Sequence, residues 1–263
     1  MAKVQVLVAA MNESEDDALY SRMRLTTDAV IANQCGKCGK TELKVIDNEL
    51  VIISTEQKGV GRNRNTALSY ATGDILVFAD EDMVYEDSYD SMIKKAFEEL
   101  PDADCIIFDI KNDNPRGVEA PNVNKIRRLH IFNSMKFGAA RLAVRRNSLC
   151  RANVWFSLLF GGGARYGSGE DSIFIADCIR KGLKIYTYPA LIATVNQEDS
   201  TWFTGINDSY FYDKGALLAA IFPKLMFIMS WVFAFRFKKS ADEFSVFKIH
   251  KLLKNGMRGF KKL

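Results

Sequence analysis

The chain has 263 residues, of which 48% are hydrophobic and 26% are charged, and this composition excludes a largely disordered protein. The length allows one large domain, or one domain with an appendage. The net charge of +4 is too small to indicate a nucleic-acid partner. The five cysteines are an odd number with no framework spacing, so we expect a reducing compartment, the cytoplasm.

The first half of the chain alternates short apolar runs with helical segments. Strands are expected over residues 4–10, 29–32, 50–53, 75–79 and 105–108, and helices over 16–27, 62–71 and 89–100. Gly73 is expected to close the second helix in a left-handed conformation. The alternation predicts an α/β fold with a mostly parallel central sheet flanked by helices.

The second half of the chain is more irregular. Strands are expected over 137–144, 184–186 and 191–195, and a helix over 170–181, after a segment with five glycines in residues 161–169. From residue 210 onward the pattern is helical, aromatic and finally basic. We therefore expect a sheet domain over residues 1–205 and a helical, amphipathic extension over 206–263.

Polar residues follow three of the expected strands at Asn12-Glu13, at Asn33-Gln34 and at 80–82. The carboxyl ends of parallel strands form one ligand-binding edge, so these segments are expected to meet. Asp80-Glu81-Asp82 is the strongest indication of a ligand site among them. Strand formation does not require adjacent acids, whereas a hard divalent cation is bound by carboxylate oxygens. A solvated turn with acids capping the next helix is the alternative.

Two further segments suit a phosphate or a proton transfer. Gly59 and Gly61 precede Arg62 and Arg64 at the start of a helix, where backbone and guanidinium groups favour phosphate, although an ordinary turn with solvated arginines explains the same pattern. Glu170-Asp171 opens a helix behind the glycine-rich segment. These acids either complement the helix dipole or supply a general base.

Together, these motifs resemble inverting glycosyltransferases of family 2, which have the GT-A fold, and in particular bacterial members that build surface polysaccharides. The motifs are a strand followed by Asn-Glu, Gly-x-x-x-x-Arg-Asn, Thr-Gly-Asp-Ile-Leu-Val-Phe-Ala-Asp-Glu-Asp and Gly-Glu-Asp, in that order. The resemblance covers about residues 3–200. It implies transfer of a sugar from a nucleotide-sugar, for which a UDP-sugar is expected, to a glycan or a lipid-linked acceptor, with Mn²⁺ or Mg²⁺.

The resemblance also implies a donor site. Its residues would be Ala9 and Met11 beside the base, Asn33 where the family usually has an Asp that reads uracil, Arg64 beside the base and phosphates, and the acids Asp80, Glu81 and Asp82. Asp80 and Asp82 match the outer acids of the Asp-x-Asp motif, which hold the ribose and the metal. Many members have a late His as a further metal ligand, and here the matching segment has none, so Glu198 or Asp199 is a substitute candidate.

For catalysis, the resemblance assigns the base to Asp171, with Glu170 beside it. Trp202, after the last expected strand, is either a packing residue or a platform for the acceptor sugar. The spacing of Cys35 and Cys38 is zinc-like, but no second ligand pair is nearby, so a surface loop is favoured.

The end of the chain suggests a membrane surface. From Arg236 onward there are nine Lys and Arg residues against two acids, interleaved with aromatic and aliphatic residues. A helix that covers the sheet explains the apolar residues, and a membrane-surface helix explains the basic ones as well. No apolar run reaches the roughly 20 residues of a spanning helix. We therefore expect a peripheral protein on the inner face of the cell membrane.

Two other functions are weighed. A sugar nucleotidyltransferase would open with a glycine-rich loop after the first strand, and Val8-Ala9-Ala10-Met11-Asn12 has no glycine. A non-catalytic nucleotide-sugar-binding or membrane scaffold would tolerate loss of the acids, yet Asp82 and Asp171 are present.

Overall fold

A computed structural model describes residues 2–112, 122–196, 205–238 and 243–262. Its strands are β1 (Val4–Met11), β2 (Asp28–Gln34), β3 (Gly39–Val45), β4 (Asn48–Thr55), β5 (Ile75–Asp80), β6 (Met83–Tyr85), β7 (Cys105–Asn112), β8 (Arg127–Arg128), β9 (Leu142–Arg145) and β10 (Ile185–Val195). Its α-helices are α1 (Ala18–Arg22), α2 (Val60–Ser69), α3 (Tyr89–Glu99), α4 (Arg146–Ala152), α5 (Glu170–Arg180), α6 (Asp208–Ile221), α7 (Met226–Lys238) and α8 (Val246–Phe260).

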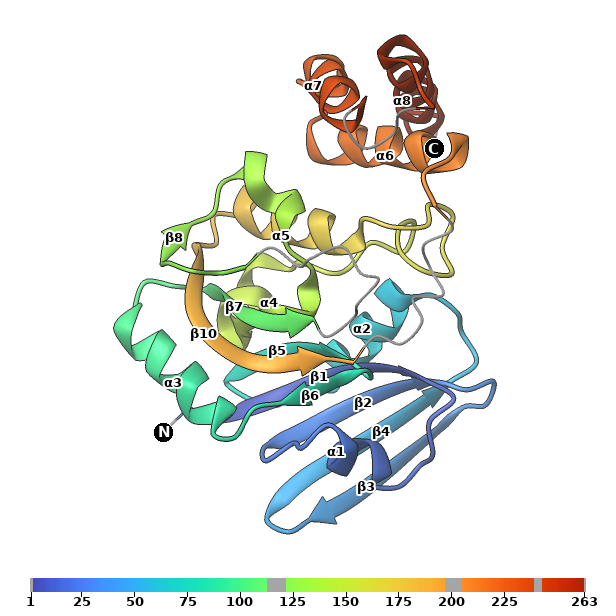
Figure 1. Ribbon diagram of the computed structural model, residues 1–263. Helices are drawn as coiled ribbons and strands as arrows, with labels where there is room; N and C mark the ends of the chain where they lie inside the picture. Colours follow the sequence, from blue (N-terminus) through green and yellow to red (C-terminus); the bar gives the residue numbers. More distant parts are fainter. Residues whose placement is uncertain (1, 113–121, 197–204, 239–242, 263) are drawn as a thin grey trace.

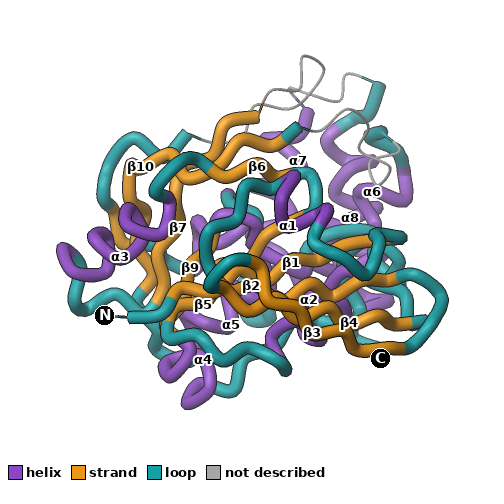
Figure 2. The backbone as a smooth tube through the Cα atoms, turned by 90° about the horizontal axis from the view of Figure 1, so that it is seen from below, coloured by secondary structure: helices purple, strands orange, loops and turns teal. Residues whose placement is uncertain are grey.

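The described strands form one sheet in the order β3-β4-β2-β1-β5-β9-β7-β10-β6, with β8 on β10 (Figure 1 and Figure 2). Strands β4, β2, β1 and β5 are parallel neighbours, and β7 and β10 run in the same direction. Strands β3, β6, β8 and β9 are antiparallel to their neighbours. The expected α/β fold with a mostly parallel sheet is confirmed, as a mixed sheet.

Several expected elements differ in detail. The segment expected as one strand over 137–144 is a 3₁₀ turn (Ala139–Arg141) followed by β9, which inserts antiparallel between β5 and β7. The two short strands expected over 184–186 and 191–195 are one strand, β10, whose register shifts between Tyr188 and Leu191. The first helix is only α1, and the edge strand β3 was not expected because its residues are largely polar and exposed.

Gly73 has a different role from the one expected. It does not have a positive φ, and α2 ends at Ser69, with Tyr70 as its C-cap. A Cβ at Gly73 would lie 2.7 Å from the Cβ of Gln5 in β1, whose side-chain oxygen accepts hydrogen bonds from the backbone of Thr72 and Gly73. The glycine is needed for this close approach of two backbones.

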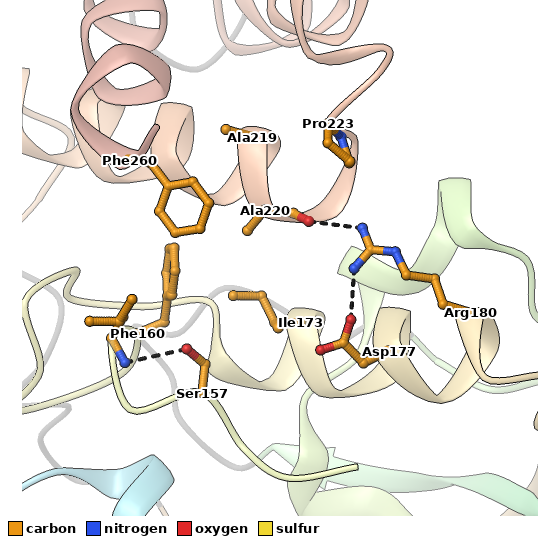
Figure 3. Close-up of a pocket in the computed structure, with 10 residues that line it drawn as sticks. Ser157, Phe160, Ile173, Asp177, Arg180, Ala219, Ala220, Pro223 and Phe260 are labelled. Carbon is orange, nitrogen blue, oxygen red and sulfur yellow. Dashed lines mark hydrogen bonds and ion pairs between the residues drawn. The ribbon is translucent and has the colours of Figure 1, made fainter. Parts of the chain in front are cut away.

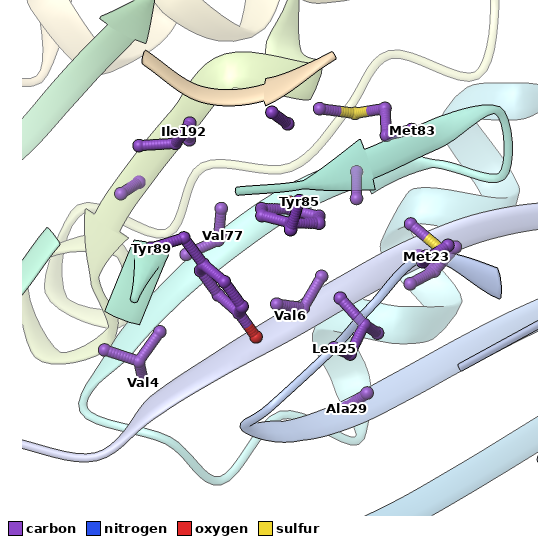
Figure 4. Close-up of a cluster of buried hydrophobic side chains, with 14 of the residues drawn as sticks. Val4, Val6, Met23, Leu25, Ala29, Val77, Met83, Tyr85, Tyr89 and Ile192 are labelled. Carbon is purple, nitrogen blue, oxygen red and sulfur yellow. The ribbon is translucent and has the colours of Figure 1, made fainter. Parts of the chain in front are cut away.

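Hydrophobic cores lie on both faces of the sheet. On one face, Val4, Val6 and Val77 pack with residues of α1, β6 and α3. The rings of Tyr85 in β6 and Tyr89 in α3 are tilted against each other there, with centroids 4.5 Å apart (Figure 4). On the other face, side chains of the central strands pack with α2, α4 and α5. Burial on both faces explains why β1 and β5 are continuous apolar runs.

Helices α6, α7 and α8 form a layer beyond α5, away from the β3–β4 edge (Figure 1). Their core includes Phe211 and Leu253 and extends to Phe160 and Ile173 of the sheet domain. Helices α6 and α8 meet at Gly215 and Gly256, where an added Cβ would lie 2.0 Å from the Leu253 carbonyl oxygen and 1.8 Å from the Tyr212 carbonyl oxygen, respectively. None of the helices in the described ranges has the length and hydrophobicity that crossing a bilayer requires.

The glycine contact between α6 and α8 predicts a stability effect. Gly256→Ala should lower the free energy of unfolding by about 2 kcal/mol, because overpacking at the Tyr212 carbonyl outweighs the gain in helix propensity. Urea denaturation followed by circular dichroism measures the change. The neighbouring exposed residue provides the control, since Asn255→Ala should change stability by less than about 0.5 kcal/mol. Equal effects of the two variants would contradict a role for close packing.

Candidate active site

The carboxyl ends of β1, β2 and β5 meet at one edge of the sheet. Ala9 is paired with Asp80 of β5 on one side and with Ala32 of β2 on the other. The backbone N–H of Met11 donates to Oε2 of Glu81 at 2.6 Å. The structure therefore brings the three polar segments together, as the strand order requires.

Asn33 is completely buried and its amide binds the turn that follows β1. Its Oδ1 accepts from the N–H of Glu13 at 3.1 Å, and its Nδ2 donates to the Glu13 carbonyl oxygen at 2.7 Å. The side chain that was expected beside the base thus supports the turn after β1 in this structure.

Arg64 of α2 joins the two halves of the site. Its Nη2 donates to Oδ1 of Asp80 at 2.8 Å, and its Nη1 donates to Oε1 of Glu170 at 3.0 Å and to Oδ1 of Asp171 at 2.5 Å. The side chain is only 4% exposed and lies over the ring of Phe156. Burial lowers the pKa of Arg64, but the charges of Asp171, Asp80 and Glu170 outweigh burial, so its pKa is raised.

Polar contacts from α2 fix the position of this arginine. Asn63 donates to the carbonyl oxygen of Ala10 in β1 at 2.9 Å. Asn65 exchanges two hydrogen bonds with the backbone of Phe156, at 2.8 and 2.9 Å. Gly61 allows the helix to approach closely, because a Cβ there would lie 2.4 Å from the Ser157 carbonyl oxygen. The residues of the Gly-x-x-x-x-Arg-Asn pattern therefore fix the position of the Arg64 guanidinium, and they do not form a phosphate-binding loop.

The glycine-rich segment 161–169 curves around Glu170. A Cβ at Gly161 would lie 2.8 Å from Cδ of Glu170, and Gly161 and Gly169 both have positive φ. The Oε2 atom of Glu170 accepts from the N–H of Gly169 at 3.1 Å. With its other oxygen on Arg64, Glu170 holds the loop against α2, and the neighbouring Asp171 is 23% exposed.

Burial raises the pKa of Asp171, an effect that Arg64 opposes and that Glu170 and Asp80 reinforce. Burial and the neighbouring Asp80 raise the pKa of Asp82 to about 6. Among the described residues no cation pairs with the Asp82 side chain, whereas Asp80 has Arg64. A carboxylate of this kind, beside a second one, suits a hard cation.

The described residues contain no group of three metal-ligating side chains. This agrees with the way Mg²⁺ is commonly bound, by one or two carboxylates with the remaining positions taken by water and substrate phosphates. Asp80 and Asp82 fit that donor set. Glu198 and Asp199, the substitutes considered for the missing His, lie outside the described residues, as does Trp202.

Sequence reasoning did not find the residues of α6 that contact the glycine-rich loop. Asp213 accepts from the N–H of Gly167 at 2.8 Å, and Nζ of Lys214 donates to Oγ of Ser168 at 3.3 Å. Burial lowers the pKa of Lys214. The sequence offered one signal for these two residues, because Asp213 and Lys214 are charged and stand just before the apolar helical run 215–222. Cys35 and Cys38 lie in the loop between β2 and β3, where Cys38 is exposed.

A separate cavity of about 350 Å³ lies between α5, α6 and the end of α8 (Figure 3). Its walls are largely apolar, with Phe160 facing Phe260, and Arg180 donates at its rim to the carbonyl oxygen of Ala220. It is not lined by the acids of the site. The candidate metal ligands and the candidate base therefore lie in the carboxylate cluster and not in this cavity.

The comparisons with known proteins agree with this fold. Residues 41–154 match the model of glycosyl transferase family 2. Residues 1–349 of TarS from S. aureus, in complex with UDP-GlcNAc, have a similar structure, with a TM-score of 0.66 at 13% identity over 98% of this chain and 92% of that one. The UDP complex of the same fragment gives 0.63 at 14% identity over 99% and 91% of the two chains. No curated protein sequence matches the chain.

The Arg64 cluster predicts a pH-dependent stability effect. Arg64→Met should lower the free energy of unfolding by about 3 kcal/mol near pH 7.5, because it leaves the buried Glu170 and the partly exposed Asp80 and Asp171 without their cation. Without Arg64, which opposes the rise, the pKa of Asp171 should lie further above its unfolded value, so the deficit of the variant should shrink as the pH falls and Asp171 is protonated. Urea denaturation at several pH values measures this. Arg62→Met, on the same helix but outside the cluster, should show neither effect.

Proposed function

We propose that the chain is a glycosyltransferase of family 2, whose model it matches over residues 41–154, and that it transfers a sugar from a UDP-sugar, with inversion, to a glycan or lipid-linked acceptor in cell-surface polysaccharide synthesis. The observation that carries the proposal is that Arg64 contacts both Asp80 and Asp171, at 2.8 and 2.5 Å. A candidate metal ligand and a candidate base, far apart in the sequence, thus share one site.

We propose that the donor lies along the ends of β1 and β2. Ala9 and Met11 would line the base, with Asn33 supporting the turn beneath it. Arg64 would face the phosphates, and Glu81 would orient the backbone of Met11 beside them. TarS binds UDP-GlcNAc on a similar fold, which favours a uridine nucleotide as the donor class.

Asp80 and Asp82 would hold the divalent metal, Mn²⁺ or Mg²⁺, together with the donor diphosphate. The bound metal would offset the negative charge that develops on the diphosphate leaving group. Asp82, which no cation of the described residues pairs, supports this assignment, because a cation would relieve the unfavourable burial of its charge.

We propose Asp171 as the general base. It would accept the proton of an acceptor hydroxyl as that oxygen attacks the anomeric carbon opposite the leaving diphosphate, which inverts the configuration. Glu170 would act beside it by holding Arg64 and the N–H of Gly169. Trp202 remains a candidate for stacking on the acceptor sugar.

We further propose the division into a catalytic domain over residues 1–205 and a membrane-associating extension over 206–263. A lipid-linked acceptor would make a peripheral position on the inner face of the cell membrane useful. A non-catalytic scaffold is the second candidate, since Arg64 already occupies Asp80 and Asp171, as it would in a site that binds a donor without turning it over.

Donor binding is tested first by thermal unfolding. UDP or its sugar conjugates with Mn²⁺, at about 100 times Kd, should raise Tm by roughly 5 °C, because the ligand binds only the folded state. Asp82→Asn should lose the metal-dependent part of the shift, and Asp87→Asn, an exposed neighbour, should keep it. No shift with any UDP-sugar, with Mn²⁺ or with EDTA, would contradict the donor site.

The base is tested by turnover. Asp171→Asn should lower kcat by about 10³-fold while the donor-induced Tm shift is retained, because only proton transfer is lost. Asp177→Asn, on an exposed side of the same helix, is the matched control. Donor binding without turnover by the wild-type protein, over a panel of acceptors, would favour the scaffold.

The pH profile of the wild-type enzyme gives a further check. Because burial raises the pKa of Asp171, kcat should rise with pH through a range above that of an ordinary aspartate, where the base becomes deprotonated. The residual activity of Asp171→Asn should lack this rise. A wild-type profile that is flat from pH 5 to 8, measured with chemistry rate-limiting, would contradict the assignment.

A further inference from the structure

Helix α7 presents a wide apolar face that no described residue covers. Its members are exposed by 37% to 63% and recur at helical spacing: Phe227, Ile228, Trp231, Val232 and Phe235. The buried residues Met226, Ser230 and Ala234 lie on the other side of the helix. A contiguous exposed apolar stripe of this kind marks a contact surface.

Helix α8 continues this face across the helix–helix seam. Phe247 is 76% exposed, and its ring lies 5.9 Å from that of Trp231. Trp231 also stacks on His250, with ring centroids 3.8 Å apart, and His250 contacts Ser230 across the same seam. The two helices therefore form one continuous surface, and ring contacts between them fix the position of Trp231.

The rest of the exposed side of α8 is basic. Lys251 and Arg258 are exposed and Lys254 is partly exposed, on the side away from the buried Ile249 and Leu253. Neither α7 nor α8 contains an acidic residue. An apolar stripe with aromatic rings beside a row of cations matches the interface of a bilayer that contains anionic lipid.

We infer that this α7–α8 face, in the enzyme proposed above to work at the membrane, binds the surface of an anionic phospholipid bilayer. The aromatic rings of Trp231, Phe235 and Phe247 enter the headgroup region, and Lys251 and Arg258 contact lipid phosphates. The charge favours this occupant over a second copy of the chain, because two such faces would bring their cations together.

Helix α6 links this face to the site. It packs against α8 through Gly215 and Gly256, and its Asp213 and Lys214 bind the glycine-rich loop. A bilayer bound at α7 and α8 is therefore one helix away from the glycine-rich loop that leads into α5 and Asp171. This position suits an acceptor whose lipid stays in the bilayer.

Vesicle co-sedimentation of the full chain tests the inference. Binding should be strong to phosphatidylcholine vesicles that contain phosphatidylglycerol, weak to phosphatidylcholine alone, and reduced by salt. Lys251→Ala with Arg258→Ala should weaken binding at least about tenfold. Phe235→Ser with Phe247→Ser should weaken it as strongly. Tryptophan emission should shift to the blue on binding, and Trp231→Phe should remove the shift while Trp155→Phe keeps it.

Matched controls lie on the opposite side of the molecule. Ile46→Ser removes an apolar residue that is 87% exposed, and Lys44→Ala removes an exposed cation, and neither should change binding. All variants should keep the Tm and the donor-induced shift of the wild type. Failure of the donor shift with vesicle binding intact would reject the catalytic proposal alone.

Two results would overturn the inference. One is the absence of binding to anionic vesicles by folded wild-type protein. The other is binding that the α7 and α8 variants leave unchanged. A concentration-dependent dimer in light scattering that Phe235→Ser with Phe247→Ser dissociates would instead assign the face to a second copy of the chain.

Discussion

The ion pairs of one buried guanidinium hold the candidate site together. Arg64 collects carboxylates from the end of β5 and the start of α5, which would otherwise repel one another in a poorly hydrated place. One cation facing three carboxylates still leaves a net negative site. In the proposed reaction a diphosphate adds further negative charge, so the metal and the donor must enter together for the charge to balance.

Glycines make this convergence possible. Gly61 lets α2 approach the chain at Ser157, and Gly161 lets the loop fold over Glu170. At Gly169, a Cβ would lie 2.7 Å from Leu217 of α6. The glycines therefore allow α2, the loop and the helical extension to approach one another more closely than any side chain at these positions would permit. A loop held on both sides in this way can keep Asp171 in place while leaving it partly exposed.

Helix α8 has two different sides, one that packs closely on the rest of the extension and one that faces solvent. Toward α6 it needs close packing, which Gly256 allows, and toward solvent it carries cations and Phe247. A helix that served only to cover the core would have no need for an exposed phenylalanine. The same three helices thus complete the fold, support the glycine-rich loop and present the face that we assign to lipid.

The sequence by itself determined the α/β class and the sheet edge where the acids collect, because buried parallel strands are apolar runs and ligand groups follow them directly. It did not determine β3 or the insertion of β9 between β5 and β7, since edge and antiparallel strands carry weaker patterns. Only the tertiary structure decided that Arg64 contacts Asp80 and Asp171 at once, and that Asn33 supports a turn. Such contacts join residues far apart in the chain, and local periodicity contains no information about them.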